Sequence, residues 1–151
     1  MTSQRSVDEF LGQRKLAVVG VSRSGRGFGH IAWKTLAKNG YEVLPVNPHA
    51  DEIGGRHCYH SLAELPPDVG GVLLVVPPVE TERIVQEAAA AGIKRVWMQQ
   101  GAESPAAVET CRSLGIDAVA GECILMFVER SGLPHKFHHW VWGVLGKLPQ
   151  A

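Results

Sequence analysis

The sequence has few cysteines and no excess of charge of either sign. Its three cysteines, Cys58, Cys111 and Cys123, are an odd number without a C-x-x-C pair, which argues against a disulfide framework and against a zinc site. Fifteen Lys and Arg balance fifteen Asp and Glu, so the formal net charge is zero. A neutral surface does not attract nucleic acid or an acidic membrane as a whole. Any binding site that uses positive charge must therefore rely on a local group of Lys or Arg side chains.

Long apolar runs are missing as well. The longest ones, such as residues 71–79, are far too short to span a bilayer, and the N-terminal residues are polar. We therefore expect no membrane span and no signal peptide, and a cytoplasmic protein. A chain of 151 residues with 45% hydrophobic residues suits one domain over 1–151. We place its core at about 11–130 and a helical tail at 131–151.

Short apolar runs alternate with segments of helical spacing along most of the chain. The predicted strands are 16–21, 42–46, 71–76, 95–99 and 118–120. The predicted helices are 29–38, 81–91, 105–114 and one that begins within 121–129. This alternation is typical of an α/β fold, a Rossmann-like, doubly wound parallel sheet of about five strands in three layers.

Local patterns give finer expectations. Ser6 and Glu9 form a capping box that predicts the start of a short N-terminal helix. Residues 49–60 show no regular pattern and are expected to form an irregular connection with a turn at Gly54-Gly55. The helix after Pro105 carries an apolar stripe that we expect to be buried, formed by Val108, Cys111 and Leu114.

A loop rich in Gly, Ser and Arg follows the first predicted strand, from Gly20 to Arg26. Parallel sheets bind ligands at the carboxyl ends of their strands, and the next helix offers unpaired N–H groups to an anion. Glycines such as Gly20 let the backbone approach a phosphate closely. Ser22 and Ser24 add hydroxyl donors, while Arg23 and Arg26 add fixed charge. The loop predicts a nucleotide-type phosphate site, with a plain connecting loop as the alternative.

The loop differs from the usual dinucleotide and nucleotide fingerprints. Counted from Gly20, the second glycine of G-x-G-x-x-G falls at Ser22, and no Gly-Lys-Ser/Thr follows. The second strand ends in Val46-Asn47-Pro48-His49, without the carboxylate that usually binds the ribose of NAD. The third ends in Val76-Pro77-Pro78, which either packs on a purine or simply terminates the strand. Together these ends favour an adenine nucleotide other than NAD.

Five short motifs at the ends of successive strands resemble those of the small stand-alone coenzyme A-binding proteins. These proteins are similar to the N-terminal, CoA-binding domain of the succinyl-CoA synthetase alpha subunit. The motifs are Gly20-x-Ser22, Val46-Asn47-Pro48, Val76-Pro77-Pro78, Trp97-x-Gln99 and Gly121-Glu-Cys123-Ile-x-Met126, within about 11–130. The resemblance implies a Rossmann-like domain that binds CoA or acyl-CoA. It implies phosphates on the loop, adenine beside Val76 and Pro77, and a pantetheine arm toward Gln99, Gln100, Gly101 and Cys123.

The sequence also departs from this family. His49 stands where relatives often carry lysine, so pairing with a phosphate there would depend on pH. The synthetase domain with the phosphorylated histidine has no counterpart here, so the resemblance implies binding without catalysis. Two alternatives stay open. One is an NAD(P)-dependent oxidoreductase or redox sensor, favoured by Gly25-x-Gly27. The other is a regulatory or partner subunit of an acyl-CoA enzyme, or a homo-oligomer, that uses 134–148 as its contact surface.

Three further features could belong either to a functional site or to the packing of the protein. His135, His138 and His139 form no metal-binding spacing that we recognise, and we expect an amphipathic tail rather than a metal site. Trp97 is expected to lie in the core. Cys123 follows the last predicted strand, and we hypothesise that it forms a mixed disulfide with CoA under oxidising conditions. The alternative is a small packing residue beneath the pantetheine.

Overall fold

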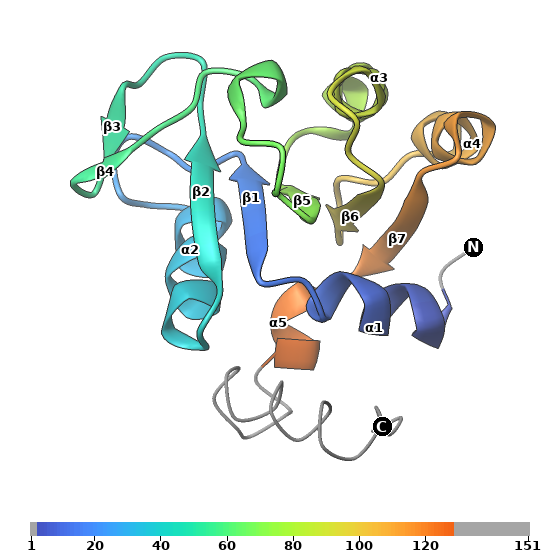
Figure 1. The fold of residues 1–151 in the computed structure, drawn as a ribbon, viewed down its shortest axis with the longest axis horizontal. Coiled ribbons are helices and arrows are strands. Elements are labelled where there is room, and N and C mark those ends of the chain that lie inside the picture. The colour runs from blue at the N-terminus through green and yellow to red at the C-terminus, as the bar shows by residue number, and fades with distance from the viewer. Residues whose placement is uncertain (1–2, 129–151) are drawn as a thin grey trace.

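A five-stranded parallel sheet lies between two layers of helices in the computed structural model of the chain, which describes residues 3–128 (Figure 1). The strands are β1 (Lys15–Val19), β2 (Glu42–Val46), β5 (Gly71–Leu74), β6 (Arg95–Gln99) and β7 (Asp117–Glu122). Their order is β2-β1-β5-β6-β7, and every neighbouring pair is parallel. The winding direction therefore reverses between β1 and β5, where open α/β sheets bind ligands.

Helices cover both faces of the sheet. One face carries α1 (Gln4–Leu11), α2 (Phe28–Lys38) and α5 (Ile124–Val128), and the other carries α3 (Pro78–Ala90), α4 (Pro105–Leu114) and the short 3-10 helix η1 (Leu62–Glu64) (Figure 1). β5 is buried at all four of its residues, as expected for a parallel strand covered on both faces. The predicted Rossmann-like, three-layer fold is confirmed.

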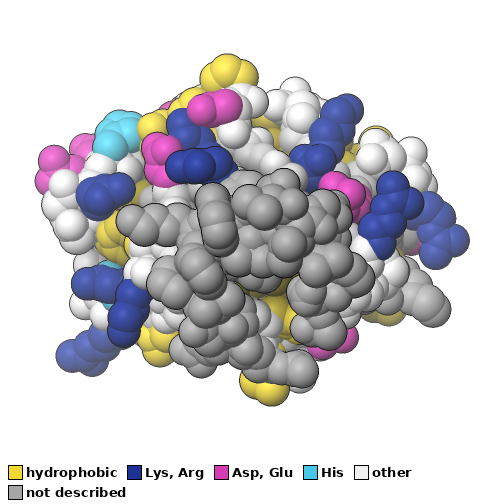
Figure 2. All heavy atoms as spheres, turned by 60° about the horizontal axis from the view of Figure 1, so that its bottom comes forward, with side chains coloured by type: hydrophobic (Ala, Val, Ile, Leu, Met, Phe, Trp, Pro, Cys, Tyr) yellow, Lys and Arg dark blue, Asp and Glu magenta, His cyan; other side chains and the backbone are white. Residues whose placement is uncertain are grey.

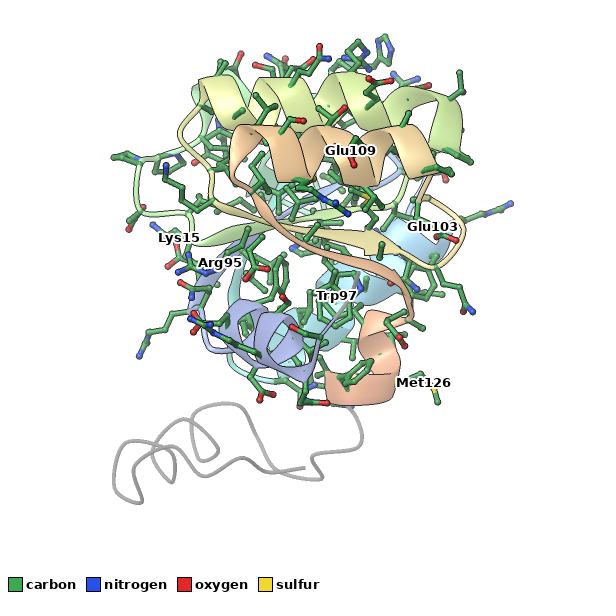
Figure 3. The ribbon with its side chains drawn as sticks, turned by 90° about the vertical axis from the view of Figure 1, so that its right-hand side faces the viewer. Lys15, Arg95, Trp97, Glu103, Glu109 and Met126 are labelled. Atoms are coloured by element: carbon green, nitrogen blue, oxygen red, sulfur yellow. The ribbon has the colours of Figure 1, made fainter. Side chains whose placement is uncertain are left out.

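Trp97 is fully buried between the sheet and the α1/α5 layer, as Figure 3 shows. Its ring meets the rings of Phe10 and Phe127 edge-on, with centroids 5.3 and 5.6 Å away. Its indole N–H donates to the carbonyl oxygen of Glu122 at 3.0 Å. A buried Trp with a satisfied N–H is a packing residue, so the expectation that Trp97 belongs to the core is confirmed.

Two local predictions are wrong. The N-cap of the first helix is Ser3, three residues before the predicted Ser6, and the Ser3 hydroxyl accepts from the Ser6 N–H at 3.1 Å. Leu114 is 46% exposed rather than buried. The helix ends at Leu114, and the Ile116 N–H donates back to the Cys111 carbonyl at 2.9 Å. This turn buries Ile116, which takes the place in the core expected for Leu114.

Element boundaries also differ from the prediction. β1 ends at Val19 rather than at residue 21, and α3 begins at Pro78, in the first helical turn where proline is favoured. Ser104 is the N-cap of α4, and its hydroxyl accepts from the Ala107 N–H at 3.0 Å. The connection 49–60 contains a short antiparallel pair, β3 (Glu52–Ile53) and β4 (Arg56–His57), around the predicted turn.

In Figure 2, Lys and Arg side chains lie in several separate groups around the edge of the view, and Asp and Glu side chains lie beside some of these groups. Within residues 3–128, no helix combines the length and the apolar character needed to cross a membrane. The predicted tail 131–151, its contact surface 134–148 and its three histidines lie outside the described residues.

Candidate functional site

A cavity of about 450 Å³ opens at the carboxyl ends of β1, β2 and β5. It lies at the point where the winding of the sheet reverses, the position expected for a ligand. Among the residues predicted from the sequence, those that line it are Gly20, Ser22, Asn47, Pro48 and Val76. The structure therefore brings together three of the five motifs, from three different strand ends.

Two glycines allow close packing between the end of β1, the loop 20–26 and the start of α2. Gly20 has φ of 111°, and a side chain there would collide with the carbonyl oxygen of Val75, directly after the neighbouring strand β5. A side chain at Gly29, in the first turn of α2, would collide with the carbonyl oxygen of Gly20. The loop is thus clamped between the end of the sheet and the start of α2. The N-cap of α2, Gly27, has no side-chain capping bond, so the first helical N–H groups stay available to an anion.

The hydroxyl groups of the loop form a compact turn. The oxygens of Ser22 and Ser24 are 2.6 Å apart, and the Ser24 N–H donates to the Ser22 hydroxyl at 2.9 Å. Ser22 lines the cavity, whereas Ser24, Arg23 and Arg26 are exposed beside it. The Arg23 guanidinium donates to the His49 carbonyl at 3.4 Å. Both arginines thus add positive charge to the loop without lining the cavity.

Asn47 joins the end of β2 to the loop after β1. Its side-chain N–H donates to the Val21 carbonyl at 2.9 Å, and its side-chain oxygen accepts from the His49 N–H at 2.7 Å. Both ends of the amide are therefore engaged within the protein. Asn47 positions the two strand ends that line the cavity, while His49 itself is exposed outside the lining.

The remaining predicted residues lie farther along the same edge of the sheet, outside the lining of this cavity. Pro77 is the N-cap of α3, and Pro78 follows it as the first helical residue. The buried Gln99 side chain accepts from the Ile124 N–H at 3.1 Å, tying the end of β6 to the start of α5. Gln100 and Gly101 are exposed, and Cys123 is a half-buried free thiol. Their roles, including the mixed disulfide, stay predictions.

Sequence reasoning missed the second half of the cavity. Its wall continues along one side of α3 through Glu80, Arg83, Ile84 and Glu87, and its opposite wall is the segment from His60 to Leu62. The three-, four- and seven-residue spacing of the α3 residues is the signal that they share a face. From sequence alone, that face is indistinguishable from a solvated helix surface.

His60 is held between two acidic side chains. Its ring contacts Asp51 at 2.7 Å and Glu64 at 3.4 Å, and its backbone N–H donates to Glu64 at 3.0 Å. The hydrogen bond to Asp51, with the charge of both carboxylates, raises the pKa of His60 above its ordinary 6.5. The bond from the His60 N–H lowers the pKa of Glu64. In the described part of the chain, no group of three His, Cys, Asp or Glu side chains is arranged to hold a metal ion.

An open parallel sheet with a cavity at its switch point is the arrangement of Rossmann-like nucleotide-binding domains. A family model described as a CoA binding domain matches residues 14–129. The chain belongs to this CoA-binding domain family, so the resemblance noted from its motifs is confirmed.

Two relatives match this chain over most of their own length. A conserved hypothetical protein from Pyrococcus furiosus has a solved structure that is 43% identical, with a TM-score of 0.72 over 75% of this chain and 97% of that one. The uncharacterized protein YneT of Bacillus subtilis is 28% identical over 81% of this chain and 91% of its own length.

A third relative is a subunit of an enzyme. The alpha subunit of the ADP-forming acetate–CoA ligase II of Pyrococcus furiosus is 32% identical over 91 residues, which is 60% of this chain. This chain spans only 12% to 21% of the length of the acetate–CoA ligases that it matches. The likeness therefore concerns one region of those proteins.

Proposed function

We propose that this protein binds coenzyme A or an acyl-CoA in the cavity at the ends of β1, β2 and β5. The observation that carries the proposal is the convergence of Gly20, Ser22, Asn47, Pro48 and Val76 on one cavity in a member of the CoA-binding domain family. A cavity of about 450 Å³ is within the range of small-molecule sites, which runs from about 300 to 1,000 Å³.

The two chemical ends of CoA suit different parts of this edge. The pyrophosphate lies on the loop 20–26, where free helix N–H groups, the Ser22 hydroxyl and two arginines offer donors and positive charge. The pantetheine arm extends toward Gln99–Gly101 and Cys123, at the adjoining strand ends. The described residues give no evidence for chemistry beyond binding, and we assign no catalytic residue.

A role as a partner of an acyl-CoA enzyme is a second candidate. It is supported by the likeness to the alpha subunit of an ADP-forming acetate–CoA ligase. A second copy of this chain is the other partner that the sequence analysis left open. Light scattering coupled to size-exclusion chromatography, with and without CoA, measures such self-association directly. A monomer under both conditions would count against a homo-oligomer.

Calorimetric titration with CoA, acetyl-CoA, dephospho-CoA, NAD and ATP tests the proposed function. We expect CoA and acetyl-CoA to bind more tightly than NAD, and Ser22→Ala to weaken CoA because it removes a hydroxyl from the cavity wall. Ser113→Ala, on the exposed side of α4, is the matched control and should bind as the wild type does. Tighter binding of NAD than of CoA would overturn the proposal.

Replacing Arg26 tests which phosphate group of CoA this side chain contacts. If the Arg26 guanidinium reaches the 3′-phosphate, Arg26→Ala weakens CoA more than dephospho-CoA. Equal losses assign Arg26 to the pyrophosphate, and no loss removes it from the site.

A further inference from the structure

A row of charged side chains runs along the side of α3 that faces the cavity. Arg83 lies between Glu80, one turn earlier, and Glu87, one turn later, and all three line the cavity. One guanidinium nitrogen donates to Glu87 at 2.6 Å, and the other is 3.4 Å from Glu80. Two carboxylates thus hold the planar guanidinium along the helix, where it forms a flat surface at the cavity wall.

The opposite wall is built from the segment that enters η1. Leu62 on this side and Ile84 on the α3 side are 2% and 4% exposed, so the floor between the walls is apolar. His60 also lines this part of the cavity, and its ring is held by Asp51 and Glu64. Buried apolar side chains and two planar groups, the Arg83 guanidinium and the His60 ring, thus line the part of the cavity between α3 and residues 60–62, which we call the slot. Such a lining suits a flat aromatic ring.

The charge of this slot distinguishes it from the loop 20–26. The α3 row contains one positive and two negative groups, and His60 also lies between two carboxylates. A phosphate would meet a net negative wall here, whereas the loop offers two arginines and free helix N–H groups. The phosphates therefore belong at the loop, and the uncharged base belongs in the slot.

We propose that the slot between α3 and residues 60–62 binds the base, with Arg83 as its stacking platform and Glu80 as the residue that selects adenine. This inference rests on the proposed function and deepens it. Glu80 keeps acceptor capacity, because its contact with Arg83 is long and weak. A carboxylate accepts from the exocyclic amino group of adenine. It repels the carbonyl oxygen that hypoxanthine or guanine presents at the same position.

The test compares CoA with the analogue in which hypoxanthine replaces adenine, by calorimetric titration at one fixed pH. The wild type is expected to prefer CoA by roughly tenfold to a hundredfold, the value of a hydrogen bond to a charged group. Glu80→Gln should reduce this preference to less than about threefold, because a carboxamide can either accept from the amino group or donate to the carbonyl. Glu109→Gln on α4 is the matched control, since Glu109 also pairs with an arginine three residues away on an exposed surface (Figure 3). It should keep the wild-type preference.

Arg83→Ala tests the stacking of the base on Arg83 separately from the selection of adenine by Glu80. We expect it to weaken CoA and the hypoxanthine analogue by the same factor, because both rings stack equally well on a guanidinium. Equal wild-type affinity for the two ligands, or an unchanged preference in Glu80→Gln, would overturn the role of Glu80. Unchanged affinities in Arg83→Ala would overturn the platform. These results leave CoA binding itself intact, whereas a wild type that binds no CoA would overturn the proposed function as well.

Discussion

Replacing Asn47 by alanine tests whether the end of β2 holds the phosphate-binding loop in place. The amide donates to the Val21 carbonyl at 2.9 Å and accepts from the His49 N–H at 2.7 Å. Alanine removes both hydrogen bonds and leaves the Val21 carbonyl and the His49 N–H without the Asn47 amide at a half-buried position. At about 0.5–1.5 kcal/mol net for each bond, the variant should lose about 1–3 kcal/mol of unfolding free energy.

Urea unfolding followed by circular dichroism measures this loss. Because urea m-values of small domains are about 1–3 kcal/mol/M, the midpoint should fall by roughly 1 M with an unchanged slope. Asn47→Asp keeps the acceptor for His49 but sets a carboxylate oxygen against the Val21 carbonyl, so it should be destabilised as well. CoA affinity should fall in both variants, because the loop loses its support.

Asn39→Ala is the control for this experiment. Its amide donates to the Thr35 carbonyl at 2.8 Å at the far end of α2, away from the cavity. It should cost about 0.5–1.5 kcal/mol of stability and leave CoA affinity unchanged. An Asn47→Ala protein as stable as the wild type would refute the bridging role.

Three further predictions concern other parts of the chain. Gly29→Ala should destabilise the fold and weaken CoA, because the added methyl collides with the carbonyl at the end of β1; wild-type stability in thermal unfolding would contradict this. The raised pKa of His60 means that the folded state holds the proton more tightly. The stability from this cluster is therefore fully present below about pH 6.5 and is lost as the pH rises through the raised value. In an NMR titration the His60 midpoint should lie above 6.5 and fall in Asp51→Asn; a midpoint that stays in place would argue against the pairing. Burial raises the pKa of Cys111 to about 11, so iodoacetamide at pH 8 should label the half-exposed Cys123 well before Cys111 in the native protein, and equal rates would be the contrary result.

The sheet and the first half of the site could be predicted because their signals are local. The apolar run at Gly71–Leu74 indicates a strand buried on both faces, and the Gly-Ser loop after β1 indicates an anion site. Strand ends in a parallel sheet meet at one edge, so the motifs could be expected to lie close together. Gly20, Asn47 and Val76 do so.

The rest depends on packing between distant segments, which local patterns do not report. Arg83 and Glu80 look like an ordinary solvated pair on a helix until α3 is placed against the segment 60–62. His60 gains Asp51 as a partner only when the connection after β2 folds back. Leu114 carries the right spacing for burial, but the turn after it lets Ile116 fill the core instead.

The most direct test of CoA binding at this cavity is a titration of the isotope-labelled protein with CoA, followed by amide chemical shifts. We predict that the largest changes fall in the loop 20–26, in residues 60–62 and along 80–87. Amides around Arg5 and Lys94, which line a separate cavity at the opposite end of the sheet, should stay in place. Changes confined to that opposite end, or no changes with saturating CoA, would contradict the account.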